Sequence, residues 1–190
     1  MNKILIGGSR SGAPLPVVRS FVAQALKAGF QFNVGCAIGA DQAVVETCLA
    51  LGAPASLSVF AIGLPGGAGF WSGSACSSVR QAAVRGASVH WLAGGSLQVP
   101  LFGRLAARSR ACLAGVGAAV FFCRAGGSGG SLKTAEVAVK HKKNVFMFCS
   151  GGSVPPSIPG LSGQWVAASL FGIPFWQWVP GQTQIVFEEV

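Results

Sequence analysis

Short apolar runs alternate with longer amphipathic segments along most of the chain. Most of the short runs are closed by glycine or a polar residue, which is typical of a buried strand. In the longer segments apolar residues recur every three or four positions, which predicts helices. The pattern predicts strands at 3–7, 30–34, 56–62, 87–92, 118–123 and 144–148, and helices at 14–28, 43–49, 76–85, 101–113 and 131–142.

This alternation of strands and helices predicts an α/β fold. Because crossovers between parallel strands are right-handed, we expect a Rossmann-like doubly wound, mainly parallel sheet with helices on both faces. Such a fold binds its ligand at the carboxyl ends of the strands. The 190 residues are expected to form a single domain, with a core at 3–148 and a tryptophan-rich extension at 150–190.

The pattern weakens in the extension. Serine, glycine and proline at 150–163 indicate a loop, 165–171 favours a short helix, and 184–188 favours an edge strand. Trp176 and Trp178 lie in the intervening segment, which receives no assignment. A tryptophan cluster near a C-terminus favours a packing or dimer surface over a base-stacking platform, so a homodimer is expected.

Composition narrows the class of protein. The chain is 51% hydrophobic, but its longest apolar run, 111–123, is interrupted by two glycines and is shorter than the ~18 residues of a membrane span. The N-terminal apolar run is too short for the core of a signal peptide. We therefore expect a cytoplasmic protein with no membrane segment.

Charge and cysteine content point to the type of ligand. Lysine and arginine outnumber aspartate and glutamate by 14 to 5, and this net charge of +9 favours polyanions or phosphorylated ligands. The six cysteines include no C-x-x-C pair, which predicts reduced thiols packed as small apolar residues and no structural zinc. The sequence predicts no metal site and no cofactor.

The central candidate for ligand binding is the glycine-rich loop between the fifth strand and the last helix. Glycines allow backbone N–H groups to close on an anion, while hydroxyls and a lysine add donors and charge. The alternative is a mobile loop without a ligand. The candidate phosphate-binding residues here are Gly127, Ser128, Gly129, Gly130, Ser131, Lys133 and Thr134.

Two earlier loops add further candidates. Gly8, Ser9 and Arg10 follow the first strand, where a Rossmann loop meets phosphate. The chain lacks both the G-x-G-x-x-G spacing and a Walker Gly-Lys-Ser/Thr ending, so ordinary dinucleotide and Walker-type binding are not supported. Gly39 and Asp41 follow the second strand, and Asp41 is expected either to cap the next helix or to accept a ligand hydroxyl. Capping is the default interpretation.

Three arginines, Arg104, Arg108 and Arg110, lie on the helix at 101–113. With no acidic partner nearby in the sequence, they favour a bound anion, and the alternative is a solvated helix face. Catalytic groups are few, because the chain has five carboxylates and two histidines and no triad signature. Glu136 is expected in the first turn of its helix, where stabilisation of the helix dipole is favoured over contact with a bound ribose.

Taken in order, these loops resemble the Rossmann-like domain of the DprA (Smf) family of DNA-processing proteins. The resemblance implies a basic pocket that grips single-stranded DNA through its phosphates, with Arg10, Arg108, Arg110, Ser131, Lys133 and Thr134 at matching positions. It spans roughly residues 3–148 and is carried by Gly8-Ser-Arg10, Gly35-Cys-Ala-Ile-Gly-Ala-Asp41, Arg108-Ser-Arg110 and Ser128-Gly-Gly-Ser-Leu-Lys-Thr-Ala135.

The wider superfamily includes the LOG phosphoribohydrolases. Their signature is only half met, because Lys133 stands where the LOG glutamate would be. We therefore expect a binding protein and not an enzyme, with single-stranded DNA as its first ligand. The alternative is a binder or sensor of a free or cyclic nucleotide, and a LOG-like nucleotide hydrolase is third.

Overall fold

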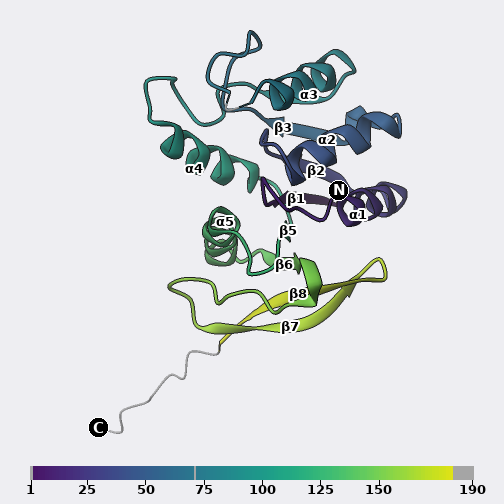
Figure 1. Ribbon diagram of the computed structural model, residues 1–190, viewed down its shortest axis with the longest axis vertical. Coiled ribbons are helices and arrows are strands. Elements are labelled where there is room, and N and C mark those ends of the chain that lie inside the picture. Colours follow the sequence, from purple (N-terminus) through teal and green to yellow (C-terminus); the bar gives the residue numbers. More distant parts are fainter. Residues whose placement is uncertain (1, 71, 182–190) are drawn as a thin grey trace, which may run out of the picture.

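The computed structural model describes residues 2–70 and 72–181 (Figure 1). The predicted edge strand at 184–188 lies outside the described residues. The elements follow in the order β1 (Lys3–Gly8), α1 (Leu15–Lys27), β2 (Gln31–Val34), α2 (Ala40–Ala50), β3 (Leu57–Phe60), α3 (Gly73–Val84), β4 (Ser88–His90), α4 (Leu101–Cys112), β5 (Ala118–Cys123), α5 (Gly129–Lys140), β6 (Asn144–Cys149), β7 (Gly163–Leu170) and β8 (Ile173–Pro180), with short 3₁₀ turns at Pro54–Ser56 and Ser150–Gly152.

The described strands form one sheet in the order β4-β3-β2-β1-β5-β6-β8-β7. Neighbouring strands from β4 to β6 are parallel, whereas β8 and β7 pair antiparallel. The prediction of an α/β fold with a mainly parallel sheet is confirmed. Strands buried on both faces read as nearly continuous apolar runs, which is why their positions were legible from the sequence.

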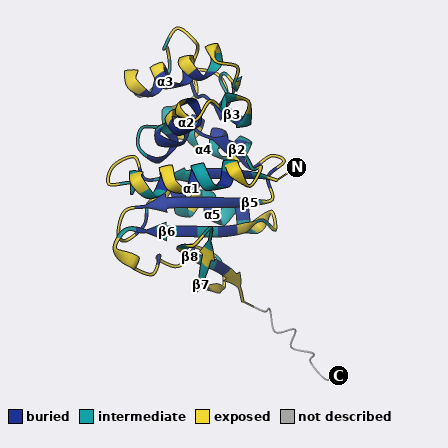
Figure 2. Cartoon of the chain, turned by 90° about the vertical axis from the view of Figure 1, so that its right-hand side faces the viewer, coloured by how far each residue is buried: buried dark blue, intermediate teal, exposed yellow. Residues whose placement is uncertain are grey.

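Helices cover the sheet on two sides, with α1, α2 and α3 on one side and α4 and α5 on the other (Figure 1). Each side has its own apolar core, and the central strands between them are buried (Figure 2). On the first side Phe21 packs edge to face against Phe122 and Phe175, with ring centroids 5.3 and 5.6 Å apart. Such aromatic pairs stabilise the core beyond the area they bury.

The extension corrects one prediction. The helix predicted at 165–171 is the strand β7, and the unassigned segment after it is β8, so the two form a hairpin at the sheet edge. Leu170 pairs with Ile173, leaving Phe171 and Gly172 as a two-residue turn with φ of 53° and 73°. Positive φ at both central residues matches the twist of a hairpin. Phenylalanine at the first turn position conceals that signal in the sequence.

All six cysteines are buried and free. Burial raises the pKa of Cys48 and Cys112 to about 12 and that of Cys149 to about 11, so these thiols stay protonated near neutral pH.

In the hairpin, Trp165 of β7 and Trp178 of β8 pack together, with ring centroids 5.2 Å apart. Among the described residues, no helix is long and apolar enough to cross a membrane.

Candidate functional site

The loops selected from the sequence meet at the carboxyl edge of the sheet. β1 lies between β2 and β5, so the order of the parallel strands proceeds outward from β1 in both directions. Ligands of open α/β sheets bind where the strand order reverses in this way. The close packing there demands glycine at Gly8, because a Cβ would collide with the carbonyl oxygen of Phe122 and with the side chain of Ala40.

Ser9 ties three elements together at this edge. Its backbone N–H donates to the carbonyl oxygen of Phe122 at 2.9 Å, and its own carbonyl oxygen accepts from the N–H of Ala40 at 3.2 Å. Its hydroxyl accepts from the N–H of Arg124 at 3.1 Å. Ser9 is buried, so its polar groups hold the first residues of α2 and the end of β5 against β1.

Two exposed arginines follow the neighbouring strands β1 and β5. Arg10 comes directly after Ser9, and Arg124 comes directly after Cys123. A Cβ on Gly12 would lie 3.3 Å from the Cβ of Arg124, so the loop after β1 passes beside Arg124. Arg124 was not among the residues predicted from the sequence, although its position as the first residue after a buried strand was a usable signal.

Asp41 and Arg108 form a buried ion pair. Arg108 Nη1 donates to Asp41 Oδ2 at 3.2 Å, and the same oxygen accepts from the N–H of Ala37 at 3.2 Å. The N-cap of α2 is Gly39, which lies two residues before Asp41, so the capping interpretation of Asp41 is wrong. Burial raises the pKa of the Asp41 carboxyl, and the guanidinium of Arg108 opposes that rise.

The other two arginines of α4 differ in their surroundings. Arg104 is buried, and it donates to the carbonyl oxygens of Ile62, Gly69 and Val99 at 2.9 to 3.1 Å. It therefore holds the loops after β3 and β4 against α4. Arg110 is exposed in the last turn of α4. Arg104 and Arg108 thus have internal partners, most of them distant in the sequence, and do not lie on a solvated helix face.

Helix α5 begins earlier than predicted, within the glycine-rich segment. The helix starts at Gly129, so Gly129, Gly130 and Ser131 form its first turn, and Ser128 is the N-cap without a side-chain cap bond. A first turn of this kind directs N–H groups and the positive end of the helix dipole toward an anion. Gly127 has a φ of 79° and lies against Pro156, and Ser131 is buried.

The remaining polar groups of α5 have different roles. Thr134 donates to the carbonyl oxygen of Gly130 at 3.0 Å, and Lys133 is exposed. Burial raises the pKa of Cys123, and hydrogen bonds with Ser131 and Ser9 oppose the rise. Glu136 is the eighth residue of the helix and pairs with Lys140 at 2.6 Å, so its predicted first-turn position is wrong.

A small hollow beside Arg10 lies at this edge. Its volume is about 10 Å³, which is room for at most one water molecule. Apolar groups of Cys36, Ile38, Ile62 and Leu105 contribute to its lining. Among the described residues Arg10 is the one cation in its lining, and a hollow of this size cannot enclose a nucleotide.

Two solved structures of DprA proteins share this fold. DprA from Helicobacter pylori, which was described for its single-stranded DNA binding mode, matches with a TM-score of 0.60 and 17% identity over 83% of this chain and 67% of that chain. The fold is DprA-like. DprA from Streptococcus pneumoniae matches with a TM-score of 0.60 and 21% identity over 84% of this chain and 52% of that chain.

The likeness to DprA concerns the fold, because both identities are low. The chain spans 67% of the length of one DprA chain and 52% of the other. No protein-family model matches the sequence, and no curated protein sequence does either. At the carboxyl edge of this DprA-like sheet, the exposed charged groups among the predicted site residues are Arg10 and Lys133, joined by Arg124.

Proposed function

We propose that the protein binds single-stranded DNA through the phosphates, at the carboxyl edge of its sheet. The observation that carries the proposal is the placing of Arg10 and Arg124 after the adjacent strands β1 and β5, with the first turn of α5 following Arg124 by five residues. Guanidinium groups and helix N-termini are the usual phosphate partners in proteins. The DprA-like fold and the net charge of +9 support the same ligand.

An extended ligand suits this surface better than a free nucleotide. A nucleotide site normally encloses its ligand, whereas the hollow beside Arg10 has room for one water. A single strand instead lies along an open basic surface. In this proposal Arg10, Arg124 and Lys133 contact phosphates, while Asp41 and Arg108 support the loop beneath them through their ion pair.

The test is the affinity for a fluorescent 20-nucleotide oligothymidine, measured by anisotropy. We expect Arg10→Gln and Arg124→Gln each to weaken binding about tenfold, because each removes a charge-assisted hydrogen bond. Arg19→Gln is the matched control, since Arg19 is exposed on α1 and its loss changes the net charge equally. Equal effects of all three variants would contradict the proposed site, and competition by mononucleotides at similar affinity would favour a nucleotide ligand.

We also expect no efficient hydrolysis of nucleotides. Cleavage of an N-glycosidic bond needs a carboxylate beside the ribose to stabilise the developing cation. Here Lys133 occupies the LOG glutamate position, Glu136 pairs with Lys140, and Asp41 is buried against Arg108. Incubation with AMP or NAD followed by chromatography should yield no free base above the background rate. Base release that disappears in Glu136→Gln would contradict this expectation.

A further inference from the structure

We propose that a strand bound at the carboxyl edge continues along the outer face of α5 to a second group of phosphate contacts at the opposite edge. This second group is Lys140, Lys142 and Lys143, named here the distal lysines. The inference rests on the proposed function, because it extends the footprint of the same strand. It predicts that long oligonucleotides make contacts that short ones cannot reach.

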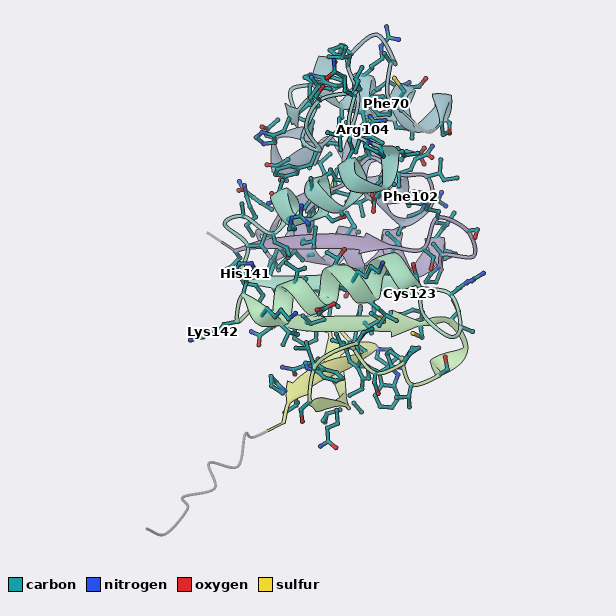
Figure 3. The ribbon with its side chains drawn as sticks, turned by 90° about the vertical axis from the view of Figure 1, so that its left-hand side faces the viewer. Phe70, Phe102, Arg104, Cys123, His141 and Lys142 are labelled. Carbon is teal, nitrogen blue, oxygen red and sulfur yellow. The ribbon has the colours of Figure 1, made fainter. Side chains whose placement is uncertain are left out.

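The cations of α5 lie along one line of the helix. Lys133 and Lys140 are seven residues apart, which is close to two full turns, so they project from the same side about 10 Å apart along the axis. Both are exposed, as are Gly129 and Gly130 at the start of the helix. Figure 3 shows α5 lying across this face, with His141 and Lys142 at one end and Cys123 near the other. The helix therefore runs from the carboxyl edge of the parallel strands to the opposite edge, where β6 begins.

The distal lysines have a basic neighbour on the same face. Arg110 is exposed in the last turn of α4, which packs beside α5 and ends at the same edge. Lys143 comes directly before β6, so it is held in place by the strand it precedes. Glu136 is the one carboxylate among the described residues of α4 and α5. The face thus attracts an anionic chain along its length.

Lys142 provides an independent observation. It has a φ of 56°, its N–H donates to the oxygen of Val139 at 2.8 Å, and the N–H of Lys143 donates to the oxygen of Ala138 at 3.0 Å. This is the common ending of a helix, in which the left-handed residue is usually glycine. α1, α2 and α3 end in the same way, with glycine at the matching positions Gly29, Gly52 and Gly86.

A lysine is therefore present where three other helices of the same chain carry glycine. A side chain in the left-handed region is strained, and strain retained in a fold is a reason to look for function. If this end of α5 faced only solvent, glycine would fit it without strain, and a lysine there would bring no compensating contact. A contact between the Lys142 ammonium and a phosphate explains why the strained lysine is present.

The ion pair between Glu136 and Lys140 acts against the bound strand. Its Nζ to Oε1 distance is 2.6 Å, and the Lys140 side chain remains 57% exposed. An exposed pair of this kind is weak, so a phosphate can displace the carboxylate. Removing the carboxylate while keeping its shape should therefore free Lys140 and strengthen the binding of a long strand.

The experiment compares oligothymidines of about four and about 20 nucleotides, which span the range of single-strand site sizes. Lys142→Gln and Lys142→Gly are expected to weaken binding of the long strand about three- to fivefold and to leave the short strand unaffected. Lys142→Gly should also raise the Tm by about 2–4 °C, because it relieves the left-handed strain. Lys27→Gln, at the exposed end of α1, is the matched control for charge.

Glu136→Gln gives a result of opposite sign. We expect it to strengthen binding of the long strand two- to threefold, whereas Glu46→Gln, the same charge change on α2, should have a smaller effect. Unchanged affinity of the long strand in both Lys142 variants, with the losses in Arg10→Gln and Arg124→Gln intact, would overturn the extended footprint and leave the proposed function standing. Failure of the unaltered protein to bind either strand would overturn both.

Discussion

Replacing Arg108 by methionine should lower the free energy of unfolding by about 3–5 kcal/mol, the largest stability effect we expect from a single polar substitution in this chain. The substitution leaves the Asp41 carboxylate buried without its cation. Since burial already raises the pKa of Asp41, losing the guanidinium that opposes this rise should leave the carboxyl protonated in the folded protein. Urea denaturation monitored by circular dichroism measures the loss.

Two further variants make the test specific. The double variant Asp41→Asn with Arg108→Met should recover part of the stability, because no charge is then left buried alone. Arg110→Met, two residues along the same helix but exposed, should change the unfolding free energy by no more than about 0.5 kcal/mol. Equal losses in Arg108→Met and Arg110→Met would show that the buried ion pair contributes little.

Gly35 lies directly against this ion pair. A Cβ at Gly35 would overlap Arg108 Nη1 and Asp41 Oδ2, so the end of β2 passes directly over the ion pair. This contact joins β2, α2 and α4 beneath the loop that carries Arg10. The ion pair thus contributes to the shape of the candidate site even though neither side chain faces the solvent.

The parallel part of the fold was predictable because its signals are local. Buried strands such as β5 are short apolar runs, and helices such as α1 show apolar residues at helical spacing. The hairpin of β7 and β8 was missed for a reason that is also local. Its turn places Phe171 at a φ of 53°, and the segment before it contains alanine, serine and leucine, which favour no strand.

The site was less predictable than the fold because its partners are distant in the sequence. Asp41 lies 67 residues from Arg108, and the carbonyl oxygens of Ile62 and Gly69 lie 42 and 35 residues from Arg104. The sequence showed three arginines without nearby acids and could not show that two of them are used internally. The left-handed backbone of Lys142 has no sequence signal either, because lysine is not a residue associated with that conformation.

The affinity for a 20-nucleotide strand should fall about 300-fold between 50 and 200 mM salt, whereas that for a four-nucleotide strand should fall about 20-fold. Single strands release about 0.7 counterions for each phosphate that the protein neutralises. Three contacts, from Arg10, Arg124 and Lys133, give the smaller value. The distal lysines double the number of contacts and give the larger one.

Isothermal or anisotropy titrations at four salt concentrations give the two slopes directly. In Lys142→Gln the slope for the long strand should fall by about 0.7, whereas the slope for the short strand should not change. Arg10→Gln should reduce both slopes by that amount, because the carboxyl edge serves strands of either length. Identical slopes for the two lengths in the unaltered protein would confine the ligand to the carboxyl edge. The difference between the slopes therefore measures how many phosphate contacts the outer face of α5 adds.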